Sequence, residues 1–199
     1  ARNIFRGLGI ALVTPFTSDG QVDYKSLKRL VEYQIDNGAD FLCILATTGE
    51  TPCLTQDEKD KITQLVKDVN HGRLPILKGC GGNNTAAVVE ELRTADWSGI
   101  DGILSVCPYY NKPSQEGLYQ HFKAIAEASP LPVVLYNVPG RTGINLKPET
   151  TVRLANDCEN IVAVEEASGS LEQVDEIMKN KPQRFDVLSG DDALTFSMV

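Results

Sequence analysis

The feature that most constrains the fold of this chain is a regular alternation of short apolar runs with amphipathic segments. The runs are rich in β-branched and aliphatic residues, which is typical of parallel strands covered on both faces. Seven such runs occur, at residues 9–13, 41–45, 75–77, 102–106, 132–135, 161–164 and 185–188. We therefore predict seven parallel strands.

The segments between these runs show helical spacing and recognisable helix ends. Residues 27–35 carry one apolar stripe, which Asn37 and Gly38 close. Thr55 and Glu58 have the spacing of a capping box at the start of the next helix. Further helices are predicted after Ser114, from Pro148, and over residues 171–177.

Strand followed by helix, repeated six times and ending on a seventh strand, predicts a (β/α) barrel rather than an open sheet. The absence of G-x-G-x-x-G after the first strand disfavours a dinucleotide-binding fold. Barrels of this kind need eight strands and about 250 residues. The expected fold class is therefore α/β, a TIM barrel truncated after about seven strands that forms one incomplete domain over residues 1–199.

Composition excludes several classes of partner. The chain is 42% hydrophobic and 23% charged, as expected of a globular protein, and its net charge of −8 argues against nucleic acid binding. No apolar run approaches 18 residues, and the N-terminal residues lack the apolar core of a secretory signal. We expect a cytoplasmic protein without a membrane span.

The five cysteines form an odd set without C-x-x-C spacing, and only two histidines accompany them. This pattern favours reduced thiols in the core over a zinc site. We expect no bound metal.

Polar sequences follow four consecutive predicted strands. Each has a simple structural reading, as turn chemistry or as packing of tyrosines. Together they would converge at one mouth of the barrel, where such folds place their chemistry. The four segments are 46–50, 79–85, 108–114 and 136–143.

At this point the chain resembles a known family. The motifs are ALVTPF at 11–16, TTGE at 47–50, PYYNKPSQEGLYQHF at 108–122, YNVPGRTG at 136–143, EASG at 166–169 and LSGDD at 188–192. In combination they are similar to the dihydrodipicolinate synthase family of pyruvate-dependent aldolases. The resemblance implies a lyase of lysine biosynthesis that condenses pyruvate with aspartate semialdehyde through a Schiff base, without a cofactor.

The resemblance also implies roles for individual residues. Tyr136 matches the proton donor and acceptor, and Thr47 and Tyr110 match the other members of a hydroxyl relay. Thr48 matches the residue that holds the pyruvate carboxylate, and Arg141 the one that binds the carboxylate of the second substrate. Tyr110 would act across a subunit interface of a homotetramer.

Glu165 departs from the family pattern. The resemblance implies a lysine at this position, and a carboxylate cannot form an imine. Two hypotheses stay open: an altered or truncated Schiff-base lyase, or a non-catalytic relative that binds small carboxylates without covalent chemistry. A borohydride-trappable pyruvate adduct would distinguish them.

Lys78 is a second departure, because it falls near the end of an apolar run. It could emerge among the loops without a role, pair with Glu165 across the barrel, or serve as a relocated amine with Glu165 as its acid/base partner.

Three smaller departures concern the loops and the C-terminus. Ala46 stands where the family has glycine, so the loop would shift if that position required a positive φ. Asn83 and Tyr109 fit the family's lysine-binding site, but Gln56 and Ala87 do not, so feedback by lysine is not expected. We also expect the eighth strand and the C-terminal helical domain to be absent, which would weaken the tetramer.

Overall fold

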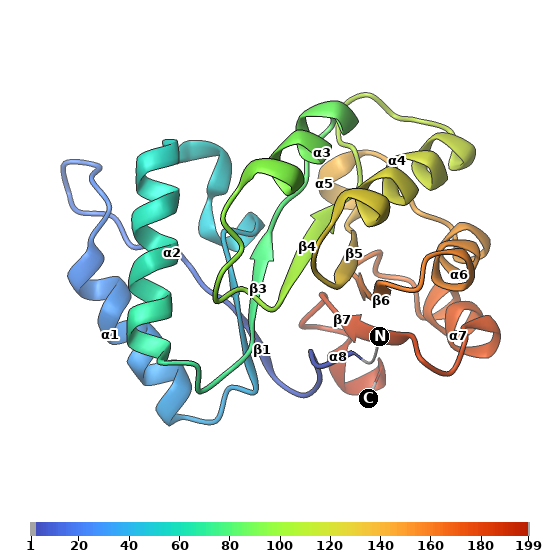
Figure 1. Ribbon diagram of the computed structural model, residues 1–199. Helices are drawn as coiled ribbons and strands as arrows, with labels where there is room; N and C mark the ends of the chain where they lie inside the picture. The colour runs from blue at the N-terminus through green and yellow to red at the C-terminus, as the bar shows by residue number, and fades with distance from the viewer. Residues whose placement is uncertain (1–2, 199) are drawn as a thin grey trace. The chain divides into compact units, whose positions relative to one another are not determined.

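The computed structural model describes residues 3–198 and divides into two compact units (Figure 1). The N-terminal unit comprises Ile4–Gly79 and Trp97–Asp101. The C-terminal unit comprises Cys80–Asp96 and Gly102–Val199, with Ala1–Asn3 added. The expectation of one domain over residues 1–199 stays a prediction.

The N-terminal unit contains three parallel strands in the order β1-β2-β3, with helices α1 and α2 side by side (Figure 1). All four residues of β2 are buried. The elements are β1 (Gly9–Ala11), α1 (Tyr24–Asp36), β2 (Phe41–Ile44), the 3-10 turns η1 (Thr47–Gly49) and η2 (Thr51–Cys53), α2 (Gln56–Asn70) and β3 (Ile76–Gly79).

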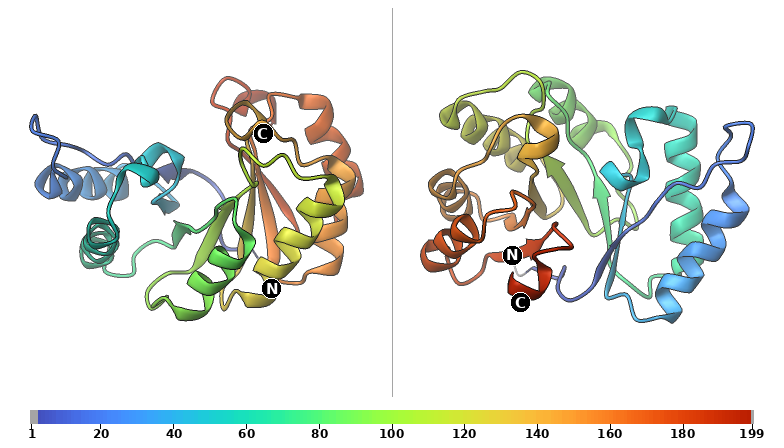
Figure 2. Two further views of the ribbon diagram at one scale, coloured as in Figure 1. Left: turned by 90° about the horizontal axis from the view of Figure 1, so that it is seen from above. Right: turned by 180° about the vertical axis from the view of Figure 1, so that it is seen from behind.

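The C-terminal unit contains four parallel strands in the order β4-β5-β6-β7. Helices α3, α4, α6 and α7 pack against one another in chain order, outside the strands (Figure 2). The elements are α3 (Thr85–Thr94), β4 (Gly102–Val106), α4 (Gln115–Ala128), β5 (Val133–Asn137), α5 (Pro139–Thr142), α6 (Pro148–Asp157), β6 (Ile161–Glu166), α7 (Leu171–Asn180), β7 (Asp186–Ser189) and α8 (Thr195–Met198).

Local sequence explains where the helices begin. The capping box predicted for α2 is confirmed: the Glu58 backbone N–H donates to Thr55 Oγ1 at 3.3 Å, and the Thr55 N–H donates to Glu58 Oε2 at 2.8 Å. Four further side chains each accept a hydrogen bond from a backbone N–H of the first helical turn. They are Asp23 on α1, Asn84 on α3, Ser114 on α4 and Ser170 on α7.

The predicted alternation of parallel strands and helices is confirmed, with shifted boundaries. Strands β3, β5, β6 and β7 end beyond their apolar runs, so that Lys78, Tyr136 and Glu165 lie inside strands rather than after them. The bounds of helix α3 were not predicted from the sequence. Its signals in the sequence are the cap at Asn84 and the apolar pair Val88 and Leu92, both buried.

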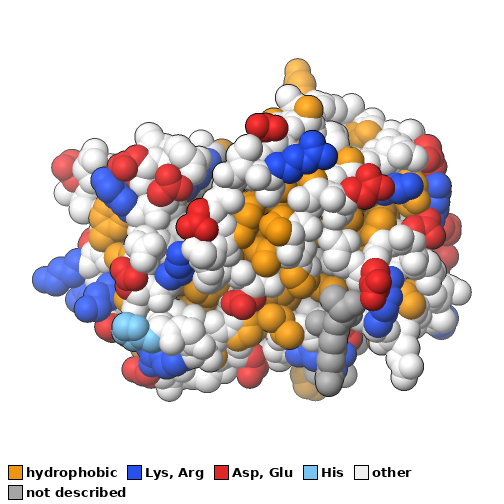
Figure 3. Space-filling model, viewed as in Figure 1, with side chains coloured by type: hydrophobic (Ala, Val, Ile, Leu, Met, Phe, Trp, Pro, Cys, Tyr) orange, Lys and Arg blue, Asp and Glu red, His pale blue; other side chains and the backbone are white. Residues whose placement is uncertain are grey.

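The charges on the surface concern nucleic acid as a partner, and the length and hydropathy of the helices concern a membrane. On the face that Figure 3 shows, basic and acidic side chains are interspersed, and no continuous basic patch covers it. Among residues 3–198 there is no helix with both the length and the hydropathy that a bilayer crossing requires.

Helices α3 and α4 are joined by a buried histidine. His121 is 4% exposed, and its Nδ1 lies 2.8 Å from Thr85 Oγ1. Its Nε2 has no hydrogen-bond partner within the described residues. Burial lowers the pKa of His121 from 6.5 to about 4.

This histidine makes stability depend on pH. Between about pH 6.5 and 4 the unfolded chain binds a proton at His121 that the folded chain does not. The free energy of unfolding should therefore decrease as the pH is lowered through this window, by up to about 1.4 kcal/mol per pH unit. Urea titrations of the parent and of His121→Gln across this window should show the slope flattened in the variant. His71→Gln is the matched control, because His71 is exposed; an equal flattening there would contradict the assignment.

Candidate functional site

The expected site residues are divided between the two units. Thr47, Thr48 and Lys78 lie in the N-terminal unit, and Tyr110, Tyr136, Arg141 and Glu165 lie in the C-terminal unit. The groupings that the structure establishes are therefore those within each unit.

Thr47 and Thr48 lie in the turn η1, directly after β2. Ala46 precedes the turn with φ −94° and ψ −167°, so this position does not require the positive φ that would favour glycine. The Thr51 hydroxyl donates to the Ala46 carbonyl at 2.9 Å, and the Thr14 hydroxyl donates to the Gly49 carbonyl at 2.6 Å. These bonds hold the turn, and the Thr48 side chain is exposed.

Lys78 is buried in β3 rather than exposed among the loops, with 8% of its surface accessible. Its Nζ lies 5.2 Å from the centre of the Trp97 ring, within the same unit. A cation over an indole face is stabilised by the ring quadrupole, which explains how a lysine is tolerated in this strand. Pairing with Glu165, or service as an amine, stays a prediction.

The loop after β4 carries Tyr110 in an unusual backbone conformation. Tyr110 and Lys112 have φ of 71° and 49°, in the left-handed region that non-glycine residues rarely adopt. Asn83 Nδ2 donates to the Tyr109 backbone carbonyl at 3.1 Å, and Asn111 Nδ2 donates to the Asn83 backbone carbonyl at 2.8 Å. The loop thus presents Tyr110 with 87% of its surface exposed.

Tyr110 and Arg141 come from segments that touch. The Tyr110 backbone N–H donates to the Thr142 carbonyl at 3.3 Å, next to Arg141 in the short helix α5. Arg141 is exposed, and its role in binding a carboxylate stays a prediction.

Tyr136 and Glu165 are register partners on the adjacent parallel strands β5 and β6. Partners in a parallel pair project to the same face, on strands about 4.8 Å apart. Tyr136 is 9% exposed, and Glu165 is partly buried. Burial raises the pKa of Glu165 to about 7, so that its carboxyl group gains and loses a proton near neutrality.

Glu166, one residue further, lies on the opposite face in a network of hydrogen bonds. It is 1% exposed and accepts from Asn137 Nδ2 at 3.1 Å, from Gln173 Nε2 at 3.0 Å and from the Ser168 backbone N–H at 2.9 Å. Asn145 completes the network, since it accepts from Asn137 Nδ2 at 2.8 Å and donates to Gln173 Oε1 at 2.8 Å. The network ties the ends of β5 and β6 to α7 and to the segment before α6.

Sequence reasoning missed this network. Its signals were an asparagine and a glutamate that each end an apolar run, where unpaired polar groups would be costly. Cys107 lies beside it, with Sγ 3.9 Å from Asn137 Oδ1. Burial, followed by the negative charge of Glu166, raises the pKa of Cys107 to about 12, so this thiol is not a nucleophile at neutral pH.

The other cysteines and the metal prediction bear on cofactors. Cys43, Cys80, Cys107 and Cys158 are buried as expected of core thiols, but Cys53 is exposed. Within residues 3–198 no three His, Cys, Asp or Glu side chains group in a way that could hold a metal.

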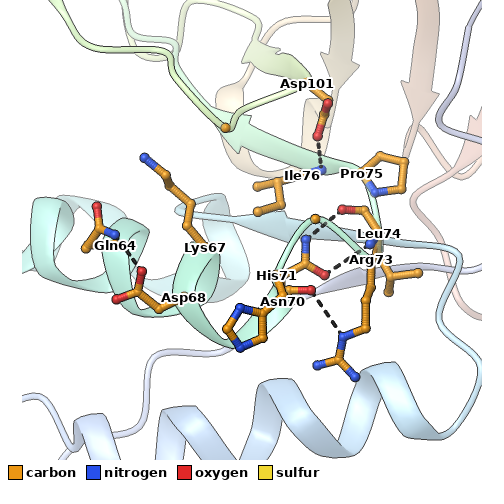
Figure 4. Close-up of a pocket in the computed structure, with 12 residues that line it drawn as sticks. Gln64, Lys67, Asp68, Asn70, His71, Arg73, Leu74, Pro75, Ile76 and Asp101 are labelled. Carbon is orange, nitrogen blue, oxygen red and sulfur yellow. Dashed lines mark hydrogen bonds between the residues drawn. The ribbon is translucent and has the colours of Figure 1, made fainter.

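The N-terminal unit has a cavity of about 630 Å³ (Figure 4). It is formed at the end of α2 and the start of β3, and none of the seven candidate residues lines it. Asp101 accepts there from the Ile76 N–H at 2.8 Å, and Asn70 Nδ2 donates to the Leu74 carbonyl at 2.7 Å. These polar groups serve the turn between α2 and β3.

Comparison with known proteins identifies the family. A model of the dihydrodipicolinate synthetase family matches residues 4–199. The 4-hydroxy-tetrahydrodipicolinate synthase of Phocaeicola vulgatus is 60% identical over 194 residues, which cover 98% of this chain and 65% of that protein. The chain thus spans about 65% of the length of this curated relative.

Solved structures agree with this assignment. The dihydrodipicolinate synthase of Thermotoga maritima is 44% identical with a TM-score of 0.94, over 98% of this chain and 67% of that one. The chloride-inhibited enzyme of Acinetobacter baumannii, solved in complex with pyruvate, is 43% identical with a TM-score of 0.93, over 98% of this chain and 67% of that one. The predicted α/β fold class is confirmed, and this chain belongs to the dihydrodipicolinate synthetase family.

Proposed function

We propose that this chain is part of a protein of the 4-hydroxy-tetrahydrodipicolinate synthase type that binds pyruvate but forms no imine with it. The observation that carries the proposal is Glu165, which stands on β6 beside Tyr136 where the family's Schiff-base lysine is expected. A carboxylate has no nitrogen with which to condense with a ketone.

The remaining roles follow the family resemblance. Thr48 binds the pyruvate carboxylate, and Arg141 binds the carboxylate of aspartate semialdehyde, the second substrate of the full enzyme. Tyr136, Thr47 and Tyr110 move the proton, since a chain of hydroxyls can do what one phenol with a pKa near 10 does poorly. The bond between the Tyr110 and Thr142 backbones supports a common task for Tyr110 and Arg141.

The setting of the site is proposed on the same grounds. Members of the family act in lysine biosynthesis through the imine that Glu165 cannot form, and we propose that the complete protein is a cytoplasmic homotetramer that needs no cofactor. The 87% exposure of Tyr110 supports an interface there, because a large aromatic side chain left open to water favours burial by a partner.

Pyruvate binding and borohydride trapping test the proposal together. Saturable binding is expected, and Thr48→Val should weaken it by roughly 10-fold, the value of one hydrogen bond to a charged group. The matched control is Thr63→Val on α2, whose hydroxyl bonds its own helix at the Lys59 carbonyl. After borohydride reduction, peptide mass analysis should show no adduct.

Two outcomes would contradict the proposal in different ways. If pyruvate did not bind, the proposal that this protein binds small carboxylates would be wrong. An adduct on Lys78 would instead establish that lysine as a relocated Schiff-base amine, and the statement that no imine forms would be wrong.

A further inference from the structure

Glu165 and Tyr136 bring a carboxyl group and a phenol together on one face. Their strands are in register at this point, and both residues lie at the carboxyl ends of their strands. In parallel α/β folds this is the edge where ligands bind. A carboxyl group and a hydroxyl in this arrangement can act on the same small molecule from neighbouring positions.

The Glu165 carboxyl group is available for proton transfer. Within residues 3–198 it has neither a hydrogen bond nor an ion pair, and no neighbouring charge contributes to its raised pKa. Its other strand neighbour is the apolar Leu188 on β7. Beyond β7 the chain lies close to it, since a methyl group on Gly190 would be 2.7 Å from Glu165 Oε1.

Two neighbouring carboxylates already accept hydrogen bonds. Glu166 is saturated by its bonds to Asn137, Gln173 and Ser168 on the opposite face. Asp191, after β7, accepts from the Ala193 backbone N–H at 3.0 Å. The titratable group that faces Glu165 from β5 is Tyr136.

We propose that Glu165 is a general base that removes a methyl proton from a bound 2-oxo acid such as pyruvate, with the Tyr136 hydroxyl donating a hydrogen bond to the enolate oxygen. This inference rests on the proposed function, because it requires pyruvate to bind at this site. The product is the enolate, and return of a solvent proton completes an exchange reaction without an imine.

The step balances without any co-reactant. A Glu165 carboxylate oxygen takes the proton from C3, and the electrons of that C–H bond form the C2–C3 double bond. The carbonyl π electrons move to the oxygen, which accepts the hydrogen bond from Tyr136. A carboxylate base paired with a phenolic donor is an established way to form an enolate, and a base whose pKa lies near the working pH is the most effective.

Exchange of the pyruvate methyl protons in D2O tests the inference. Loss of the methyl signal by proton NMR should be about 100-fold faster with the chain than in buffer, a typical contribution of general base catalysis. Glu165→Gln should return to the buffer rate, and Tyr136→Phe should lose roughly 10-fold or more. Glu172→Gln, an exposed glutamate on α7, is the matched control and should be unchanged.

The pH dependence and the binding data separate the possible failures. The rate should rise with pH through about 7, where the pKa of Glu165 lies, and then level off. Bound pyruvate without exchange, or exchange that persists in Glu165→Gln, would overturn this inference and leave the proposed function standing. Absence of pyruvate binding would overturn the proposed function, and this inference with it.

Discussion

Replacing Glu165 with lysine is expected to give a pyruvate adduct at position 165 that borohydride converts to a stable secondary amine. The position is partly buried, next to Tyr136, at the carboxyl end of β6. Burial disfavours the ammonium form, so the pKa of an introduced lysine should fall and the free amine should become available to attack the ketone. We expect a change from no labelled chain to labelling of most chains.

Peptide mass analysis after reduction locates the adduct. Glu172→Lys, which places a lysine on the exposed face of α7, is the matched control and should remain unlabelled. A Glu165→Lys protein that binds pyruvate yet forms no adduct would show that position 165 is not where this fold presents a Schiff-base amine. The altered-lyase interpretation of Glu165 would then be wrong.

The strand and helix pattern was predictable because burial on both faces leaves a plain mark in sequence. The run at 102–106 coincides with β4, and the capping box at Thr55 and Glu58 is formed. Strand ends were harder to place, because Tyr136, Asn137, Glu165 and Glu166 are polar or amphipathic and yet pair within strands. Their pairing depends on neighbours that are distant in sequence, which periodicity does not report.

The candidate site was predictable as a set of residue types, but its supporting interactions were not. Resemblance selected Tyr136 and Glu165, and strand register makes them neighbours. That Glu166 would be the saturated carboxylate and Glu165 the unpaired one follows from contacts with Asn137, 29 residues earlier, and Gln173, 7 residues later. Such contacts are properties of the packed structure.

Replacing Glu166 with glutamine is expected to lower the free energy of unfolding by about 2–4 kcal/mol, the worth of one to two hydrogen bonds to a charged group. The substitution keeps the volume but exchanges one acceptor oxygen of the carboxylate for an NH2 donor group. That donor would face Asn137 Nδ2, Gln173 Nε2 or the Ser168 N–H, all of which already donate to Glu166. Urea unfolding of the parent and the variant measures the difference.

A second substitution separates a network effect from a general loss of packing. Adding Gln173→Glu to Glu166→Gln moves the carboxylate from position 166 to position 173. There it can accept hydrogen bonds from the amide introduced at position 166 and from Asn145 Nδ2, which already donates to position 173. A double-mutant cycle should therefore show coupling of about 0.5–3 kcal/mol in favour of the swapped pair. Glu172→Gln on the exposed face of the same helix should stay within about 0.5 kcal/mol of the parent. Additive losses in the cycle would mean that Glu166 contributes only by filling space. Positive coupling would mean that hydrogen bonds behind the site hold the ends of β5 and β6, and with them the register that places Tyr136 beside Glu165.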